Sequence, residues 1–490
     1  MKLLYLFSLS IFFKILFFSN YVFCASHSKE EWKSRSIYQI LTDRFALTND
    51  NDKIQCSALN VYCGGTFQGI KKHLDYIKGM GFDAIWISPP LKNKEGSFHG
   101  YHNIDLDSIN EHFGTEQELK DLIQACHDKD IWVILDAVPN HMAGDVSIAS
   151  LKPFNLDDHY HTLTDKDCEG HWDEQYYKEN CRIWGMPDLN QENPAVNTTL
   201  INWLKNTLNK YDFDGVRYAD VVNAPTWFWG NLTYAVDGTY TIGIFDSQDV
   251  DYIASYQNYM DGVGNYPFFR QVRNSFCEGS MVNLDNYIQT SRPKFKAPKY
   301  NGIWFDNHDN ERFLYDCSLG TKFKGLRNIV IFTLFSEGIP IFYYGDEQYL
   351  DNGGENDRRR QPLFGNYDEE SDLYIIIKIA HEVRKKYKIV DTDFVSRYVD
   401  EDNFVFTRGN DVMIAVSKGK TQTIEVRDHG FNDNDKFCNK LNTLDCVSVN
   451  NDVLIIPMNG EPKIYIRNSK GDLIYISSYL LLFLILLSIF

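Results

Sequence analysis

The chain has 490 residues, with 49 Lys and Arg against 67 Asp and Glu, so its net charge is −18 at pH 7. Hydrophobic residues make up 43% and charged residues 24%, which are globular proportions and exclude a disordered or fibrous chain. The acidic charge is spread along the sequence and repels phosphate backbones, so we expect no nucleic-acid partner. Aromatic residues reach 15%, which suits sugar-stacking surfaces as well as a large core.

Apolar segments stand at both ends of the chain. Residues 1–24 begin with Lys2 and continue as a Leu, Ile and Phe run towards small residues, which is typical of a secretory signal peptide; a membrane anchor is the alternative. Residues 468–490 end in an apolar run with no basic residue after it, which indicates a GPI-anchor signal, with a retained membrane span as the alternative. We therefore expect the secretory pathway and a cell-surface location, at the plasma membrane or in the cell wall.

The ten cysteines fit an oxidising compartment, because most lie near a partner in sequence. Cys126 falls in a helical pattern and is expected to be a buried free thiol, while a bridge between Cys277 and Cys317 stays open. Two sequons, at Asn197 and Asn231, are glycosylation candidates on the lumenal route. The expected local disulfides join Cys56 with Cys63, Cys168 with Cys181, and Cys438 with Cys446.

Short apolar runs alternate with helical patterns such as Glu116–Asp128 and Thr199–Tyr211. Such alternation favours a parallel sheet, and eight repeats over this length predict a (β/α)8 TIM barrel. The expected strands are Ile37–Phe45, Phe82–Pro90, Trp132–His141, Gly215–Val222, Thr241–Asp246, Gly262–Phe269, Gly302–Asp309 and Pro340–Glu347.

Two segments interrupt or follow the barrel pattern. Residues 143–194 are polar and loop-rich, which predicts an inserted subdomain after the third strand. After residue 390 the helical patterns stop, and short strands predict a C-terminal antiparallel β-domain over 391–467. The barrel itself is expected over 25–142 and 195–390.

Six motifs stand in a fixed order: Ser36–Phe45, Cys63–Gly69, Leu74–Phe82, Asp136–His141, Met186–Asn190 and Phe305–Asn310. With them the chain resembles the secreted fungal α-amylases of glycoside hydrolase family 13 over roughly residues 32–467. The resemblance implies their barrel, their α-1,4-glucan substrate and their calcium ion.

The resemblance also implies a retaining mechanism, in which a carboxylate nucleophile and an acid/base carboxyl group lie about 5–5.5 Å apart. In the motif Gly215–Asn223, Ala219 occupies the nucleophile position. Ile244 occupies the acid/base position in Tyr240–Asp246, and neither side chain can perform its step. Only the third carboxylate, a transition-state stabiliser, is kept, as Asp309.

Two neighbouring carboxylates are candidate substitutes. Asp220 lies one residue past Ala219, where strand alternation would turn it to the opposite face unless a bulge intervened. Asp246 lies two residues past Ile244, on the same face but about 6–7 Å further along.

The remaining site residues are carried over from the family by motif. Oxygen donors from an amide, two carboxylates and a main-chain carbonyl suit Ca²⁺. The implied sugar-binding residues are Tyr101, His141, Arg217, His308, Asn356 and Arg360, and the implied calcium ligands are Asn140, Glu179, Asp188 and the carbonyl of Asn223.

Three functional hypotheses follow. The first is a cell-surface α-amylase homologue impaired in hydrolysis, which binds α-glucan or acts in cell-wall assembly. The second is an active α-amylase or 4-α-glucanotransferase that uses shifted carboxylates. The third is a structural wall protein without a sugar ligand.

Overall fold

The structure, a computed structural model, describes residues 27–50, 56, 60–354 and 357–468. Eight parallel strands form its central sheet, in the spatial order β8-β7-β6-β5-β2-β1-β10-β9. A parallel bridge between Gly264 and Gly302 joins the two edges and closes the sheet into a barrel. The strands are β1 (Ile37–Ile40), β2 (Ala84–Ile87), β5 (Trp132–Ala137), β6 (Gly215–Tyr218), β7 (Tyr240–Gly243), β8 (Gly262–Val263), β9 (Gly302–Ile303) and β10 (Ile339–Tyr343).

The barrel strands are buried along their whole length, as expected when helices cover a parallel sheet. One covering helix, α6 (Glu116–His127), begins with a capping box between Thr115 and Glu118 and buries its apolar positions at helical spacing. The other helices are α2 (Lys29–Trp32), α3 (Thr42–Phe45), α4 (Phe67–Lys72), α5 (Leu74–Gly79), α7 (Asp165–Cys168), α8 (Gln175–Asn180), α9 (Pro194–Tyr211), α10 (Thr226–Ala235), α11 (Val250–Ser255), α12 (Tyr266–Phe276), α13 (Met281–Ser291), α14 (Phe313–Asp316), α15 (Lys322–Phe335) and α16 (Asp372–Lys386).

Two excursions leave the barrel on the side where the strands end. Strands β3 (Leu91–Asn93) and β4 (Asn103–Ile109) form an antiparallel pair after β2. The longer excursion runs from β5 to α9 and contains α7 and α8. It returns to the barrel through an antiparallel bridge between His141 and Asp188, so it is anchored directly beside the strand ends.

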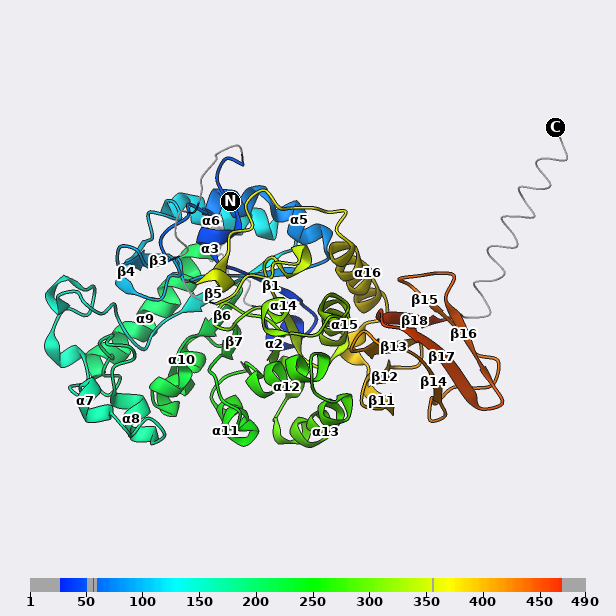
Figure 1. The fold of residues 1–490 in the computed structure, drawn as a ribbon. Helices are drawn as coiled ribbons and strands as arrows, with labels where there is room; N and C mark the ends of the chain where they lie inside the picture. Colours follow the sequence, from blue (N-terminus) through cyan, green and yellow to red (C-terminus); the bar gives the residue numbers. More distant parts are fainter. Residues whose placement is uncertain (1–26, 51–55, 57–59, 355–356, 469–490) are drawn as a thin grey trace, which may run out of the picture.

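A second sheet of eight antiparallel strands packs beside α15 and α16 at one end of the barrel (Figure 1). An ion pair between Arg327 of α15 and Glu461, 2.7 Å, joins the two parts. Its strands are β11 (Phe394–Val399), β12 (Asn403–Arg408), β13 (Val412–Ser417), β14 (Thr421–Val426), β15 (Lys436–Asn439), β16 (Cys446–Asn450), β17 (Val453–Asn459) and β18 (Lys463–Arg467).

The predicted fold class, a TIM barrel with an inserted segment and a C-terminal β-domain, is confirmed, but several element bounds differ. The expected strand Gly262–Phe269 is wrong after Val263, because Asn265 caps α12 and Pro267 lies in its first turn. The expected strand Gly302–Asp309 pairs only at Gly302–Ile303, and the rest is loop.

The cysteines form four disulfides in the described part of the chain: Cys56–Cys63, Cys168–Cys181, Cys277–Cys317 and Cys438–Cys446. Cys126 is buried and free, as predicted. The structure thus answers the open question about Cys277 and Cys317.

Among the described residues, no helix is long and apolar enough to cross a membrane. The predicted signal peptide, residues 1–24, and all but Asn468 of the predicted anchor signal lie outside those residues.

Candidate functional site

A cavity of about 490 Å³ opens where the barrel strands end. This is the face on which TIM barrels place their chemistry, because the loops after the strands converge there. Its lining includes His99, Tyr101, His102, His141, Trp184, Met186, Arg217, Ala219, Asp220, Ile244, Asp246, Tyr266, His308, Asp309, Arg359 and Arg360.

A buried network around Asp136 forms the inner side of this cavity. Arg217 Nη1 donates to Asp136 Oδ1 at 2.8 Å, and the Tyr101 hydroxyl donates to Oδ2 at 2.6 Å. Trp86 Nε1 donates to the same oxygen at 3.0 Å. Burial alone would lower the pKa of Arg217, but the charge of Asp136 raises this pKa, so the guanidinium stays charged inside the barrel.

His308 and Asp309 form a second polar group after β9. Gln39 Nε2 donates to His308 Nδ1 at 2.6 Å, and Tyr101 contacts His308 Nε2 at 3.1 Å. Burial, helped by the charge of Arg360, lowers the pKa of His308 to about 4, so the imidazole is neutral at pH 7. Burial opposes the ionisation of Asp309, but its basic neighbours, including Arg360 at 3.5 Å, lower its pKa. The cavity therefore presents a neutral ring beside an ionised carboxylate.

The two positions at which the sequence resemblance places the nucleophile and the acid/base hold apolar groups. Ala219 is 1% exposed, and Ile244 is 6% exposed. A methyl group added to Gly264 would lie 2.9 Å from Ile244 Cγ1 and 2.7 Å from Trp304 Cη2, so Ile244 is closely packed. Neither position offers an oxygen that could attack a sugar or move a proton.

The expectation that Asp220 turns away from the cavity is wrong. Strand β6 ends at Tyr218, so strand alternation does not extend to residue 220. Asp220 adopts a left-handed conformation, φ 52° and ψ 41°, and lines the same cavity as Ala219. Its Oδ2 lies 3.5 Å from Nδ1 of His141, whose Nε2 contacts the carbonyl of Tyr101 at 3.0 Å.

Asp246 also lines the cavity, but it forms an ion pair with Arg270 of α12. Both side chains are partly exposed, 49% for Asp246 and 39% for Arg270. An acid catalyst must reach the leaving oxygen of the sugar, whereas Asp246 Oδ2 contacts the Arg270 guanidinium. This contact makes Asp246 a poor replacement for the family's acid/base.

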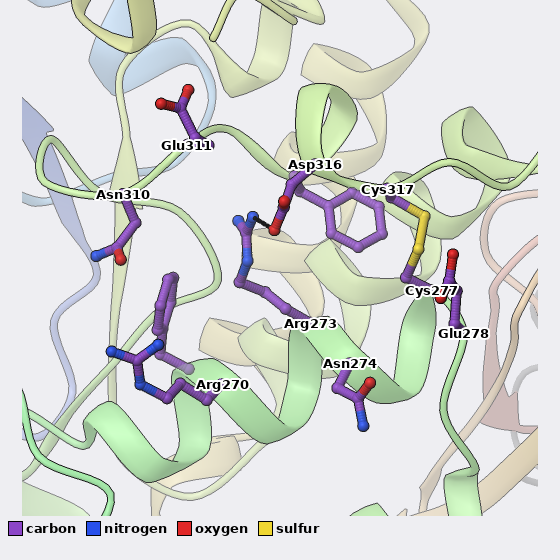
Figure 2. A pocket seen from close by; sticks show the side chains of 11 residues that line it. Arg270, Arg273, Asn274, Cys277, Glu278, Asn310, Glu311, Asp316 and Cys317 are labelled. Carbon is purple, nitrogen blue, oxygen red and sulfur yellow. Dashed lines mark hydrogen bonds and ion pairs between the residues drawn. A yellow bond between two sulfur atoms is a disulfide. The ribbon is translucent and has the colours of Figure 1, made fainter. Parts of the chain in front are cut away.

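A second cavity, of about 440 Å³, borders the first and shares Asn310 with it. Figure 2 shows Arg270 and Arg273 extending from α12 and the Cys277–Cys317 disulfide in the wall. Arg273 pairs with Asp316 at 2.9 Å and also with the buried Asp306. Arg273, the most buried charge of this cavity, therefore has its carboxylate partners within the protein.

Three of the four implied calcium ligands lie together, because the side chain of Asn140 contacts both Asp188 and the carbonyl of Asn223. Asn140 Nδ2 lies 2.8 Å from Asp188 Oδ1 and 2.5 Å from the carbonyl oxygen of Asn223. The other oxygen of Asp188 contacts His161 at 2.6 Å. Burial raises the pKa of Asp188 to about 7, although His161 and Asn140 oppose this, so a nearby cation would favour the carboxylate.

Glu179, the fourth implied ligand, lies on α8 and accepts from Gln175 at 2.6 Å; Gln175 in turn contacts the carbonyl of Val222 at 3.5 Å. Across the described ranges, no three His, Cys, Asp or Glu side chains gather to hold a metal. The candidate set instead combines two carboxylates with an amide and a carbonyl, all oxygen donors of the kind that Ca²⁺ takes.

Sequence reasoning missed Trp184 at the cavity, although Gly185 next to it directly precedes the motif Met186–Asn190 and is a turn signal. Asn356 lies outside the described residues. Of the sequon residues, Asn231 is exposed on α10, and Asn197 is half-buried on α9.

A closed parallel barrel with Arg–Asp and His–Asp groups around a cavity at its strand ends is the framework on which TIM-barrel enzymes place their active sites. The family described as "Alpha amylase, catalytic domain" matches residues 39–387, so the chain belongs to the α-amylase family.

Individual relatives agree with this assignment. An α-amylase of Saccharomycopsis fibuligera is 31% identical over an alignment of 464 residues, and the match covers 89% of this chain and 92% of that protein. Alpha-amylase 3 of Schizosaccharomyces pombe is 36% identical over 413 residues, covering 79% of this chain and 72% of the relative. The solved α-amylase of Malbranchea cinnamomea aligns with a TM-score of 0.83 at 28% identity over 90% of this chain and 97% of its own.

Proposed function

We propose that this α-amylase-family chain binds α-1,4-glucan in the barrel cavity and is impaired in ordinary hydrolysis. One observation carries the proposal: Arg217, His308 and Asp309 line the cavity beside two apolar side chains, Ala219 and Ile244. The resemblance assigns the two reacting carboxyl groups to these apolar positions. Arg217, His308 and Asp309 supply donors and acceptors matched to sugar hydroxyls. The covalent step lacks its nucleophile, and the leaving oxygen lacks its proton donor.

Relatives support the ligand class. The α-amylase of Geobacillus thermoleovorans, 29% identical with a TM-score of 0.82 over 90% of this chain and 99% of its own, was solved in complex with acarbose. Acarbose and maltoheptaose are therefore suitable probes for the cavity.

Calorimetric binding of maltoheptaose to the whole chain, together with a chromogenic maltooligosaccharide assay, tests the proposal. We expect binding without turnover. The combined variant Ala219→Asp, Asp220→Ala, Ile244→Glu should gain turnover, because it restores both carboxyl groups in a cavity that is otherwise kept. Turnover by the unaltered chain would overturn the impairment, and absence of binding would favour a structural wall protein without a sugar ligand.

A second candidate, an active hydrolase or glucanotransferase with shifted carboxylates, rests on Asp220. Its carboxylate faces the cavity near His141, so it is the better placed of the two substitutes. Under this candidate Asp220 would be the nucleophile and Asp246 the acid/base. Turnover that disappears in Asp220→Asn would establish it.

We also propose a Ca²⁺ ion held by Asn140, Glu179, Asp188 and the Asn223 carbonyl. When bound there, the ion would join the 143–194 segment to the barrel and neutralise the buried Asp188. The donor set fits because the Asn140 amide lies between the Asp188 and Asn223 oxygens. Its Nδ2 donates to both oxygens, so the amide would rotate to turn Oδ1 towards the ion.

The four disulfides agree with a secretory route. We propose that a GPI anchor at residues 468–490 attaches the protein to the cell surface, where it acts in glucan binding or wall assembly. We also propose domain boundaries at residues 142, 194 and 390. Release of the protein from cells by phosphatidylinositol-specific phospholipase C would support the anchor, and retention after this treatment would favour a membrane span.

A further inference from the structure

Trp184 is a large apolar side chain that the fold presents to solvent at the cavity. It is 87% exposed, yet it lines the cavity together with His102 and Met186. Among the described residues, no aromatic ring pairs with it, although such pairs are frequent elsewhere in the chain. A tryptophan that contributes so little to the core is available to bind something else.

The backbone under Trp184 is held in an unfavourable conformation. Trp184 has φ 49° and Gly185 has φ 77°, and the amide of Met186 donates to the carbonyl of Ile183 at 2.9 Å. Positive φ at both central residues is characteristic of a type I′ turn, which prefers Asn-Gly. A bulky residue at the first position costs free energy, and such strain is concentrated at functional sites.

The turn is fixed on both sides. The Cys168–Cys181 disulfide lies three residues before Trp184. On the other side, the Met142 amide donates to the Pro187 carbonyl at 3.1 Å, and Asp188 bridges to His141. The indole is thus displayed on an ordered support, and binding to it requires little further ordering of the chain.

We propose that Trp184 is an aromatic platform on which a glucosyl ring stacks, outside the inner group of Arg217, His308 and Asp309. An indole offers a flat apolar face to the C–H face of a sugar ring, while the sugar hydroxyls remain in water. This inference rests on the proposed glucan binding. It adds a subsite that favours ligands long enough to extend from the inner cavity to the inserted segment.

The test compares the whole chain with Trp184→Asn, because Asn tolerates positive φ and preserves the turn. Trp172→Ala is the matched control; Trp172 is an exposed tryptophan, 43%, on the same inserted segment and is absent from the cavity lining. We expect Trp184→Asn to weaken maltoheptaose binding about tenfold while its melting temperature stays the same or rises. Maltose, which we expect to occupy the inner group of Arg217, His308 and Asp309, should lose much less affinity.

The outcomes separate the two proposals. If the unaltered chain does not bind maltoheptaose, the proposed glucan binding fails, and the platform fails with it. If the unaltered chain binds and Trp184→Asn binds equally well, only the platform is overturned. A clear fall in the melting temperature of Trp184→Asn would also overturn it, because Trp184 would then be a packing residue.

Discussion

Arg217 and Asp136 are direct partners across neighbouring barrel strands, with Arg217 on β6 in register with Asp136 on β5. Their side chains meet at 2.8 Å and are 7% and 0% exposed. The same register that builds the barrel therefore also places the charged pair at the base of the cavity.

Removing one member of this pair should cost much of the protein's stability. We expect Asp136→Ala to lower the free energy of unfolding by about 3–5 kcal/mol, because it leaves the Arg217 charge buried without a partner. Urea unfolding measures the loss. A change below about 1 kcal/mol would mean that water reaches Arg217 and that the pair is not truly buried.

Asp246 offers the contrasting case, an ion pair in which both partners are half-exposed. We expect Asp246→Ala to change the free energy of unfolding by about 0–1 kcal/mol, because solvent screens such pairs. The same urea experiment serves as the comparison for Asp136→Ala. A loss of stability as large as that of Asp136→Ala would contradict the view that solvent screens this pair.

Acid should destabilise the fold partly through His381 on α16. Its Nδ1 contacts the Met80 carbonyl at 2.8 Å, while its Nε2 is buried without a hydrogen-bond partner in the described structure. Burial, with the charges of Arg384 and Lys385, lowers the pKa of His381 to about 3 from 6.5.

Below about pH 6.5 the unfolded chain binds a proton at this histidine that the folded chain does not, so stability falls as the pH drops towards 3. We expect His381→Gln, which keeps an amide donor for Met80, to flatten the decline in unfolding free energy between pH 6.5 and 4. An unchanged slope in the variant would show that other groups govern the acid response.

Calcium removal should loosen the inserted segment. We expect EDTA to lower the melting temperature of the whole chain, and Asp188→Asn to lose most of this response, because the variant lacks a buried carboxylate ligand. Differential scanning calorimetry with and without Ca²⁺ gives both values. Equal EDTA effects in the two proteins would place any bound ion elsewhere.

The barrel could be predicted because buried strands such as Ala84–Ile87 and Ile339–Tyr343 are apolar runs that alternate with helical patterns. The position of the Asp220 side chain could not be predicted. Its left-handed backbone conformation depends on local packing after the strand and does not follow the alternation of side chains along a strand. The prediction extended strand β8 too far, because the apolar residues after Val263 fit a buried helix as well as a strand. Trp184 could not be predicted as a cavity residue, because an isolated tryptophan in a loop belongs to no periodic pattern.

The barrel closes at the junction of β8 and β9, and this is where we expect the fold to open first. Strands β8 and β9 span two residues each and meet through the Gly264–Gly302 bridge, with the Asn265 amide donating to the Gly302 carbonyl at 2.9 Å. Short ladders with glycine on both sides exchange their amide hydrogens early. Because Ile244 packs against Gly264, the wall of the cavity coincides with the part of the barrel that we expect to separate first when the native state fluctuates.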